Sequence, residues 1–282
     1  MAQTPSEIKS LLSQAGTEPR KRFGQNFMID QNLVRIVAEA GRIGAGDFIL
    51  EVGPGTGTLT EELLSRASKV LAVEIDRDLA GMLRTKFAGE TRFELIEGDA
   101  LSGKHGLNEQ LNSALRAAAK RGECAKLVAN LPYQIASPLI IELLIAGVGL
   151  LAFTVQKEVA ERLRATEKDD AYGPLSIMAQ MLAKVELLRT LPPQAFWPAP
   201  KIDSALVRMT RSDQLGDTAR EFSTFVHQIF SFRRKTLRKA FVEAGFDPDV
   251  LTRLSIDPQL RAETLAPRQF HQVFVALGTK PA

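Results

Sequence analysis

Short apolar runs alternate with amphipathic stretches along the first 165 residues of the chain. Each run is four to six residues long and is bounded by glycine, polar or charged residues, a pattern typical of buried strands. These runs cover residues 48–52, 69–74, 93–97, 126–129 and 150–155. Apolar residues spaced by three and four positions predict helices over residues 30–40, 59–67, 79–87, 107–121, 138–146 and 158–165. Repeated alternation of strand and helix predicts an α/β fold, with a Rossmann-like parallel sheet covered by helices on both faces.

The pattern changes after residue 175. A helical stretch over 175–182 precedes two β-like segments, 185–191 and 204–209, which we expect to form an antiparallel edge of the sheet. Residues 211–218 are polar and mark a predicted domain boundary. Beyond that boundary the patterns are helical, over residues 222–232, 234–244, 248–254 and 267–277. We therefore expect a large domain over residues 1–212, with a flexible basic arm over 1–22, and a small all-helical domain over 213–282. Residues 1–19 of the arm are polar and are expected to be either mobile or partly helical.

Composition places the chain among soluble globular proteins. Hydrophobic residues make up 45% and charged residues 24% of the 282 residues. No apolar run approaches the roughly 20 residues that span a bilayer, and the first residues lack the apolar core of a signal peptide. With one cysteine and three histidines, the chain offers neither an internal disulfide nor a cluster of metal ligands. We expect a cytoplasmic protein without membrane contact and without a metal.

Positive charge is concentrated in two short segments, although the formal net charge is only +3. The first segment is Arg20-Lys21-Arg22. The second lies at the start of the predicted helix over 234–244, and its cations are Arg233, Arg234, Lys235, Arg238 and Lys239. Basic clusters of this kind are typical of phosphate-binding surfaces, so Arg22 and the five cations of the second segment are candidate contacts for a nucleic acid. A solvated helix face explains either cluster equally well.

A glycine-rich turn follows the first predicted strand. Residues 51–57 read Glu-Val-Gly-Pro-Gly-Thr-Gly, and glycines at a strand-to-helix turn let the backbone approach a ligand closely. The dinucleotide-binding pattern G-x-G-x-x-G is not met, because Thr58 stands where its third glycine belongs. The Gly-Lys-Ser/Thr of a phosphate-binding loop is also absent from this turn. Gly53 and Gly55 are therefore candidates for binding a different kind of ligand.

Acidic residues close the next two predicted strands. Glu74 ends the second strand, where a carboxylate can accept hydrogen bonds from two ribose hydroxyls. Asp99 follows the third strand, where a carboxylate can accept from the exocyclic amine of an adenine. Parallel strands place their carboxyl ends at one edge of the sheet, so both acids should lie near the glycine turn. Together these residues favour a nucleoside ligand without phosphates, and S-adenosylmethionine (SAM) is the best candidate.

The fourth predicted strand ends in Asn130-Leu131-Pro132-Tyr133. This tetrapeptide resembles the (D/N/S)-P-P-(Y/F/W) signature of methyltransferases that act on amino groups. The carboxamide oxygen of Asn130 and the carbonyl of Pro132 can accept the two N–H groups of an adenine N6 amine. The ring of Tyr133 can stack on a base that has left its helix. Because the amine proton can leave after methyl transfer, catalysis in such a site depends mainly on positioning and dipoles.

Several segments together resemble the bacterial small-subunit rRNA adenine N6,N6-dimethyltransferase family over nearly the whole chain. They are residues 21–27, 51–57, 130–133, 156–159, 172–173, 198–204 and 232–236. The resemblance implies SAM-dependent dimethylation of N6 of two adjacent adenosines in the 3′-terminal hairpin of 16S rRNA, within immature 30S subunits. It also implies a catalytic methyltransferase domain over 1–212 and an RNA-binding domain over 213–282. We expect the enzyme to be a monomer.

The same resemblance assigns roles to single residues. The cofactor-binding residues that it implies are Asn26, Met28, Gly53, Gly55, Glu74, Asp99 and Asn130. Within this set, Gly53 is expected under the methionine moiety of SAM, Glu74 at the ribose and Asp99 at the adenine. Phe196 is expected to form, opposite Tyr133, a second aromatic wall against the flipped target adenine. A core position in a proline-rich turn is the alternative for Phe196.

The sequence departs from the family pattern at three places, of which Ala199, where the family often has Pro, is a minor change. Gln134 stands where the family usually has Asn, which leaves residues 130–133 intact. Residues 103–123 are longer than the family connection and form either an added RNA contact or a surface helix. Two other functions stay open: a 23S rRNA adenine N6-methyltransferase, and an assembly factor that acts on 30S particles mainly by binding. The Pro-Lys-Ile-Asp-Ser run at 200–204 and the Arg-Arg-Lys-Thr run at 233–236 favour the 16S branch.

Overall fold

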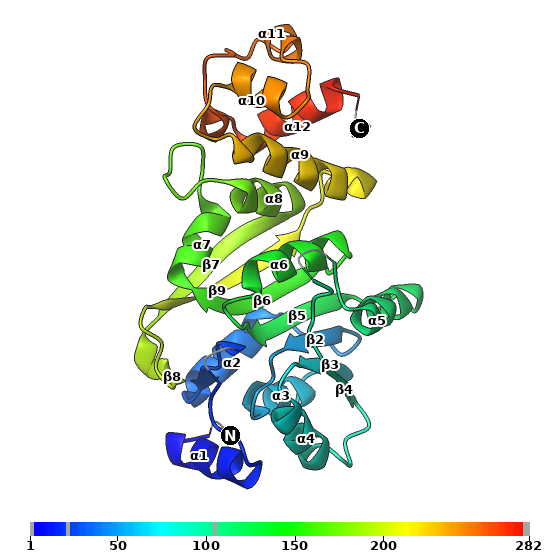
Figure 1. The fold of residues 1–282 in the computed structure, drawn as a ribbon. Helices are drawn as coiled ribbons and strands as arrows, with labels where there is room; N and C mark the ends of the chain where they lie inside the picture. Colours follow the sequence, from blue (N-terminus) through cyan, green and yellow to red (C-terminus); the bar gives the residue numbers. More distant parts are fainter. Residues whose placement is uncertain (1–2, 21–22, 104–105, 279–282) are drawn as a thin grey trace. The chain divides into compact units, whose positions relative to one another are not determined.

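The computed structural model describes residues 3–20, 23–103 and 106–278 (Figure 1). Contacts within the chain divide it into two compact units. The first unit comprises Met1–Ala160 and Glu186–Arg211, and the second comprises Glu161–Val185 and Ser212–Ala282. These compact units are not the predicted domains, because residues 161–185 group with the C-terminal residues. The predicted domain division at residue 212 stays a prediction.

The first unit is built around a seven-stranded sheet with the strand order β4-β3-β2-β5-β6-β9-β7. Its strands are β2 Phe48–Val52, β3 Lys69–Glu74, β4 Phe93–Glu97, β5 Ala125–Asn130, β6 Leu150–Gln156, β7 Ala183–Leu191 and β9 Ser204–Arg211. Neighbouring strands from β4 to β6 pair in parallel, whereas β9 pairs antiparallel with β6. The chain runs outward from β2 to β4 and then returns to β5 on the other side of β2. Sheets of this kind bind ligands where the strand order reverses, outside the carboxyl ends of the strands.

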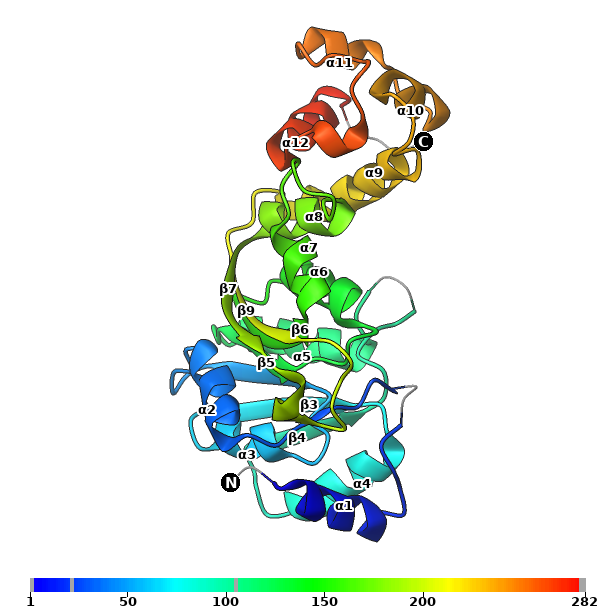
Figure 2. The same cartoon turned by 90° about the vertical axis from the view of Figure 1, so that its left-hand side faces the viewer.

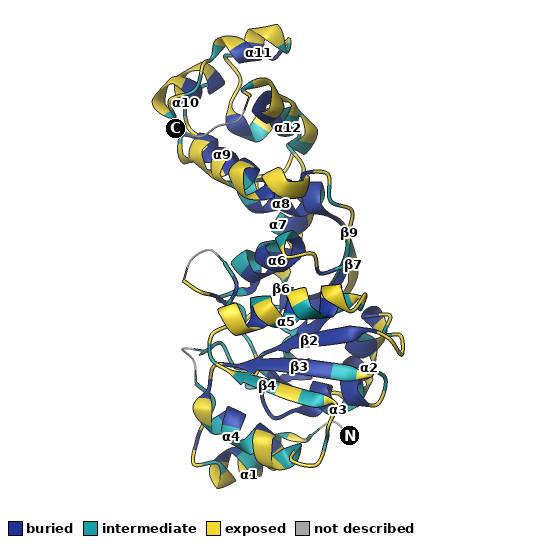
Figure 3. Cartoon of the chain, turned by 90° about the vertical axis from the view of Figure 1, so that its right-hand side faces the viewer, coloured by how far each residue is buried: buried dark blue, intermediate teal, exposed yellow. Residues whose placement is uncertain are grey.

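The predicted apolar runs at the centre of the sheet form strands because their side chains are buried between the sheet and the helices that cover it. Every residue of β2 is buried, and Figure 3 shows β2 and β3 in the buried interior. Strand β4 lies at an edge and is only half-buried. The strands predicted over 48–52, 69–74 and 93–97 have the same limits in the structure. The predicted α/β class with an antiparallel edge is confirmed.

Helices lie on both faces of this sheet (Figures 2 and 3). They are α2 Gln31–Ala40, α3 Thr58–Leu64, α4 Arg77–Lys86, α5 Glu109–Lys120 and α6 Ala136–Ile145. Polar side chains cap several of them: the carboxylates of Asp30 and Asp76 and the amide oxygen of Asn108 accept from backbone N–H groups in the first turn. Helix α5 falls in the segment 103–123 and buries Leu111, so this segment contains a packed amphipathic helix.

Two short strands, β1 Phe27–Met28 and β8 Phe196–Trp197, were not predicted. The N-terminal arm was expected to be mobile or partly helical, and its residues Pro5–Gln14 form helix α1, with a capping box at its start. Ile8 of this helix is buried in a small core cluster that also contains Phe27 and Leu79. Because β1 pairs antiparallel with β8, the N-terminal segment is tied to the connection that precedes β9.

The regular elements of the second unit, within the described residues, are helices and the first residues of β7. The helices are α7 Lys157–Arg164, which enters this unit at its fifth residue, α8 Pro174–Leu182, α9 Ala219–Ser231, α10 Leu237–Glu243, α11 Asp249–Arg253 and α12 Pro267–Ala276. The hydroxyl of Tyr172 donates a hydrogen bond of 2.7 Å to the carbonyl of Leu265, which links the residues before α8 to the segment before α12. No helix in the described ranges is long and apolar enough to cross a membrane.

An aromatic core joins α9 to α12 inside the second unit. The rings of Phe222 and Phe225 lie 5.3 Å and 5.7 Å from the ring of Phe274, in edge-on and tilted arrangements. Helix α10 begins later than predicted, at residue 237 instead of 234. The difference arises because residues 232–234 form a turn that connects α9 to α10.

Candidate active site

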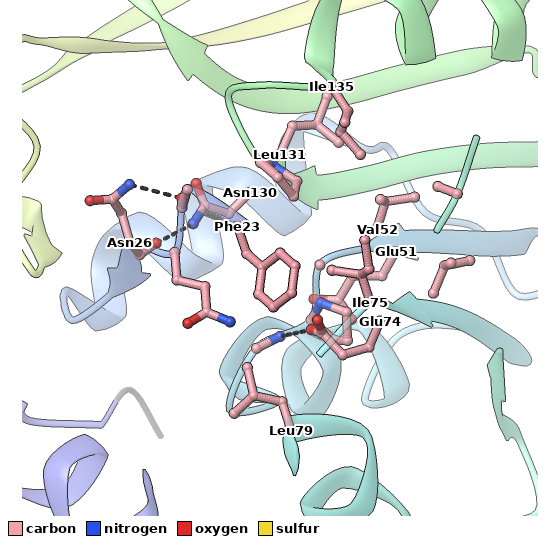
Figure 4. A pocket seen from close by; sticks show the side chains of 18 of the residues that line it. Phe23, Asn26, Glu51, Val52, Glu74, Ile75, Leu79, Asn130, Leu131 and Ile135 are labelled. Carbon is pink, nitrogen blue, oxygen red and sulfur yellow. Dashed lines mark hydrogen bonds between the residues drawn. The ribbon is translucent and has the colours of Figure 1, made fainter. Parts of the chain in front are cut away.

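The carboxyl ends of β2, β3, β4 and β5 border a cavity of about 240 Å³ in the first unit (Figure 4). Its walls come from residues 23–28, the glycine turn, residues 98–100 and residues 130–135. These segments are distant in the sequence and meet because parallel strands end at the same edge of a sheet. All the predicted cofactor-binding residues line this cavity: Asn26, Met28, Gly53, Gly55, Glu74, Asp99 and Asn130.

The glycine turn has a backbone conformation that residues with a side chain rarely adopt. Gly53 and Gly55 have φ angles of 73° and 60°. A Cβ atom on Gly53 would lie 3.0 Å from Cγ of Pro132, and one on Gly55 would lie 2.9 Å from Cε1 of Phe27. The turn therefore approaches two other cavity walls so closely that glycine is needed for space as well as for conformation.

Glu74 is a buried acid, only 3% exposed, at the end of β3. Its carboxylate oxygens accept hydrogen bonds from the backbone N–H groups of Gly55 at 3.1 Å and Asp76 at 2.9 Å. Burial raises the pKa of Glu74 to about 7, although both hydrogen bonds favour the charged form. Each carboxylate oxygen has more than one lone pair, so the group can accept further hydrogen bonds from a ligand.

Glu51 is a second buried acid of the cavity, and the sequence reasoning did not single it out. It accepts a hydrogen bond of 2.6 Å from the hydroxyl of Thr60. Burial raises the pKa of Glu51 to about 8, and the neighbouring charge of Glu74 acts in the same direction. The feature of the sequence that could have marked Glu51 as a cavity residue is its position at the start of the glycine-rich segment 51–57. A cationic ligand would favour the charged forms of both acids, because it offsets the cost of burying their charge.

Asp99 lies in the loop after β4 and is exposed. Its Oδ1 atom accepts a hydrogen bond of 3.0 Å from the backbone N–H of Leu101, which fixes the carboxylate in a local turn. Because this bond uses Oδ1, the Oδ2 atom can accept from a ligand donor.

The side chain of Asn130 is held from two sides. Its Nδ2 atom donates a hydrogen bond of 2.6 Å to the backbone carbonyl of Asn26 (Figure 4). The hydroxyl of Thr154 donates to its Oδ1 atom. The carboxamide that was predicted to accept the target amine is therefore fixed in place by neighbours on two other segments.

The rest of the predicted catalytic loop forms a turn. The carbonyl of Pro132 accepts a hydrogen bond of 3.3 Å from the N–H of Ile135, and Leu131 is buried at the cavity wall. The hydroxyl of Tyr133 lies 2.7 Å from the hydroxyl of Ser204, the first residue of β9. Burial raises the pKa of the Tyr133 phenol. The phenol is thus anchored at its tip by Ser204, and Tyr133 is one of the residues that line the cavity.

Phe196 lies apart from the other predicted catalytic residues. Its side chain is 2% exposed and belongs to the core cluster that includes Leu33 and Leu206. It does not line the described cavity, although its backbone pairs with Met28, which does. The structure therefore shows core packing for Phe196, and its role as an aromatic wall stays a prediction.

A family model, described as ribosomal RNA adenine dimethylase, matches residues 16–278 of the chain. The chain belongs to this family. Its sequence is 42% identical over 264 residues to the ribosomal RNA small subunit methyltransferase A of Hahella chejuensis, covering 92% of each protein. It is 43% identical over 274 residues to the protein of the same name from Magnetococcus marinus, covering 94% of each. The predicted family and the predicted enzyme class, an rRNA adenine dimethyltransferase, are confirmed.

Solved structures support the same fold. The chain is similar to a dimethyladenosine transferase from Plasmodium falciparum, with a TM-score of 0.70, 26% identity, and coverage of 89% of this chain and 98% of that one. A 23S rRNA methyltransferase, ErmE, shares the fold with a TM-score of 0.63 and 24% identity, covering 90% of this chain and 100% of that one.

The predicted RNA contacts of this rRNA adenine dimethylase fall into two groups. Arg233 pairs with Glu263 at 3.6 Å and Lys235 pairs with Glu243 at 2.5 Å. The others, within the described residues, are exposed and have no carboxylate within 4.0 Å: Arg234, Arg238 and Lys239. Arg22 lies outside the described residues, so the structure does not place it.

Two salt bridges of Arg20, which the sequence did not predict, hold the segment that precedes β1. Arg20 donates hydrogen bonds to the carboxylates of Asp76 at 2.8 Å and Asp78 at 2.5 Å. The side-chain amide of Gln25 donates to the other oxygen of Asp76 at 3.0 Å. The side chain of Asp76 is fully buried, so its salt bridge with Arg20 is shielded from water on the side of Asp76. It positions residues 23–28, which form one wall of the cavity.

Proposed function

We propose that this enzyme uses SAM to dimethylate N6 of two adjacent adenosines in the 3′-terminal hairpin of 16S rRNA, within immature 30S subunits. The observation that carries the proposal is the Asn130–Tyr133 loop at the end of β5, in the same cavity as the glycine turn and Glu74. This combination supplies acceptors for an amine, an aromatic ring for a base and a place for a nucleoside. A second methyl transfer at the same site needs no additional residue.

The cavity residues fit SAM by chemistry and by space. Gly53 lets the glycine turn lie against Pro132, in the part of the cavity wall where the methionine moiety is expected, and the cationic sulfonium of SAM would favour the charged form of the buried Glu74. Glu74 accepts hydrogen bonds from the ribose hydroxyls, and Asp99 accepts from the adenine amine. Asn26 and Met28 complete the wall formed by the N-terminal segment. SAM, when bound, supplies the methyl group.

The chain itself positions the amine that receives the methyl group. The Oδ1 atom of Asn130 and the carbonyl of Pro132 each keep a free lone pair beside their internal hydrogen bonds, and these accept the two N–H groups of the target amine. Tyr133 stacks on the flipped adenine, an interaction worth roughly 1–3 kcal/mol. The amine loses a proton to water after the transfer, so the enzyme needs no strong base. A contribution from Phe196 requires its ring to leave the core and enter the site.

RNA binding follows from the exposed cations of the segment 233–239. Cations without a carboxylate partner are available to phosphate and fix the position of the RNA without reading its bases. The RNA is then recognised through helix shape and single-stranded bases at the hairpin loop.

The decisive experiment uses 30S subunits that lack methylation at the 3′ end of 16S rRNA. Incubation with SAM and the enzyme should produce N6,N6-dimethyladenosine at two adjacent positions, mapped by mass spectrometry of the 3′ fragment. Undermethylated 50S subunits serve as the parallel substrate. Methylation of 23S rRNA alone would establish the alternative substrate and overturn the proposal.

Asn130→Ala separates catalysis from binding. We expect turnover to fall by about 10²–10³-fold, the usual cost of removing one preorganised polar group from an active site. Binding to 30S subunits, measured by sedimentation, should stay at the wild-type level. Wild-type turnover in this variant would show that Asn130 does not accept the amine.

A further inference from the structure

We propose that Thr154 is a positioning residue that fixes the carboxamide of Asn130 for methyl transfer. The inference rests on the proposed function, because it concerns how the acceptor of the target amine is oriented. Thr154 lies in β6, outside the glycine turn and outside the tetrapeptide 130–133, and the sequence patterns gave it no role. It does not line the described cavity, so its effect on a substrate must act through Asn130.

The parallel pairing of β5 with β6 puts the two side chains next to each other. Asn130 and Thr154 are direct partners in the register of these strands. The backbone N–H of Leu131 donates a hydrogen bond of 3.2 Å to the carbonyl of Thr154, so the pairing extends beyond the end of β5. Thr154 is 0% exposed and its hydroxyl donates to Oδ1 of Asn130. A buried hydroxyl on a central strand is thus directed at the functional amide.

The two contacts of Asn130 allow one orientation of its amide group. Its Nδ2 atom donates to the carbonyl of Asn26, and a flipped amide would place two carbonyl oxygens against each other at that point. The carbonyl of Asn26 therefore fixes the position of the amide nitrogen of Asn130, and with it the position of the amide oxygen. The hydroxyl of Thr154 then limits rotation of the side chain, because it holds the oxygen itself. One lone pair of Oδ1 remains for the target amine.

A small rotation of Asn130 is enough to affect the reaction. Misplacement of a reacting group by about 1 Å can cost up to about 10²-fold in rate, because the amine, the methyl group and the acceptor must align. A donor held against Oδ1 keeps the second lone pair in a constant direction. Because Thr154 touches no ligand site itself, its loss should change the rate of transfer and leave the binding of SAM and RNA unchanged.

The test compares Thr154→Val, which keeps the side-chain shape, with Thr154→Ser, which keeps the hydroxyl. We expect kcat to fall by about 10-fold in Thr154→Val and to stay within about 2-fold of wild type in Thr154→Ser. The KM values for SAM and for undermethylated 30S subunits should not change in either variant. If Thr154→Val does not fold, Thr154→Ala against Thr154→Ser isolates the hydroxyl at nearly equal volume.

Thr17→Val is the matched control. Thr17 is also buried in the first unit, and its hydroxyl oxygen has no hydrogen-bond partner within the described residues. This variant should keep the wild-type kcat, which separates loss of the Asn130 contact from the general effect of replacing a buried threonine.

A double-mutant cycle tests whether Thr154 acts through Asn130. In an Asn130→Ala background, measured under single-turnover conditions, Thr154→Val should cause no further loss. An equal loss in both backgrounds, or wild-type kcat in folded Thr154→Val, would overturn the inference and leave the proposed function intact. Wild-type turnover in Asn130→Ala alone would instead remove the assignment on which the inference depends.

Discussion

The cavity and the cationic segment 233–239 hold their polar side chains in opposite ways. In the cavity, Glu74 is 3% exposed with two backbone donors, and Asn130 is fixed on two sides. In the segment, Arg234 and Arg238 are exposed and have no carboxylate partner within the described residues. Changing one partner of a buried hydrogen bond has a large effect, whereas exposed charges contribute small, salt-screened increments. The polar side chains of the cavity therefore act through their fixed positions, whereas those of the segment 233–239 act through their charge.

Gly53→Ala should break the fixed geometry of the cavity most severely. An alanine at a φ of 73° is strained by about 1–2 kcal/mol, and its Cβ would push against Pro132. We expect the affinity for SAM, measured by calorimetry, to fall by at least about 10-fold. Gly81→Ala in α4 is the control, because it has open space around its Cβ position and should stabilise the protein by about 0.5–1 kcal/mol. Unchanged SAM affinity in Gly53→Ala would contradict the placement of the cofactor.

Glu74→Gln tests the cost of burying an acid in the cavity. The pKa of Glu74 rises from 4.5 to about 7, so between these pH values the folded protein keeps a proton that the unfolded chain releases. The free energy of unfolding should therefore decrease as the pH rises from about 4.5 to 7. In Glu74→Gln this decrease should be smaller, as measured by thermal unfolding across that range.

Glu51→Gln extends the same test to higher pH. Because the pKa of Glu51 is raised to about 8, its contribution to the loss of stability should continue up to that pH. If neither variant altered the pH profile, the two acids would not be as buried in solution as they are in the structure.

The double variant Arg234→Ala, Arg238→Ala tests whether the cationic segment 233–239 binds RNA through its charge. Loss of two phosphate contacts should reduce the slope of log affinity against log salt by about 2, with little change in turnover at saturating RNA. Arg253→Ala in the same unit is the control, because Arg253 pairs with Asp247 at 3.4 Å. A salt slope equal to that of the wild type would identify the segment as a solvated surface.

Tyr133→Phe should have the smallest effect. It keeps the ring that stacks on the base and loses only the hydrogen bond to Ser204, so we expect turnover to fall by about 2–5-fold. Ser204→Ala should give a loss of the same size. A loss in Tyr133→Phe as large as that in Tyr133→Ala would show that the hydroxyl, not the ring, is the functional part.

The sequence was sufficient for features that depend on local pattern. Buried apolar runs predicted β2, β3 and β4 to the residue, and the strand-end positions of Glu74 and Asp99 predicted their convergence at one cavity. The cavity could be anticipated because the edge of a parallel sheet follows from topology alone.

Features that depend on contacts between distant segments could not be predicted. The bond from Asn130 to the carbonyl of Asn26 joins residues 104 positions apart, and no local pattern marks a backbone acceptor. Phe196 is buried in a two-residue strand that is too short to have a periodicity, so no pattern decided between the core position and the aromatic wall. Arg20 was counted as part of a basic cluster because its two carboxylate partners follow β3, far along the chain.

Helix α1 sets a limit on how far the enzyme can be trimmed for crystallography or for screening of SAM-competitive compounds. The family match starts at residue 16, after α1 has ended. A fragment that begins there would lose Ile8 and uncover Leu79 and Phe27, two residues that also line the cavity. Compounds selected on such a fragment would meet a cavity whose supporting layer has been removed. Useful fragments should therefore begin before Thr4, which caps the helix.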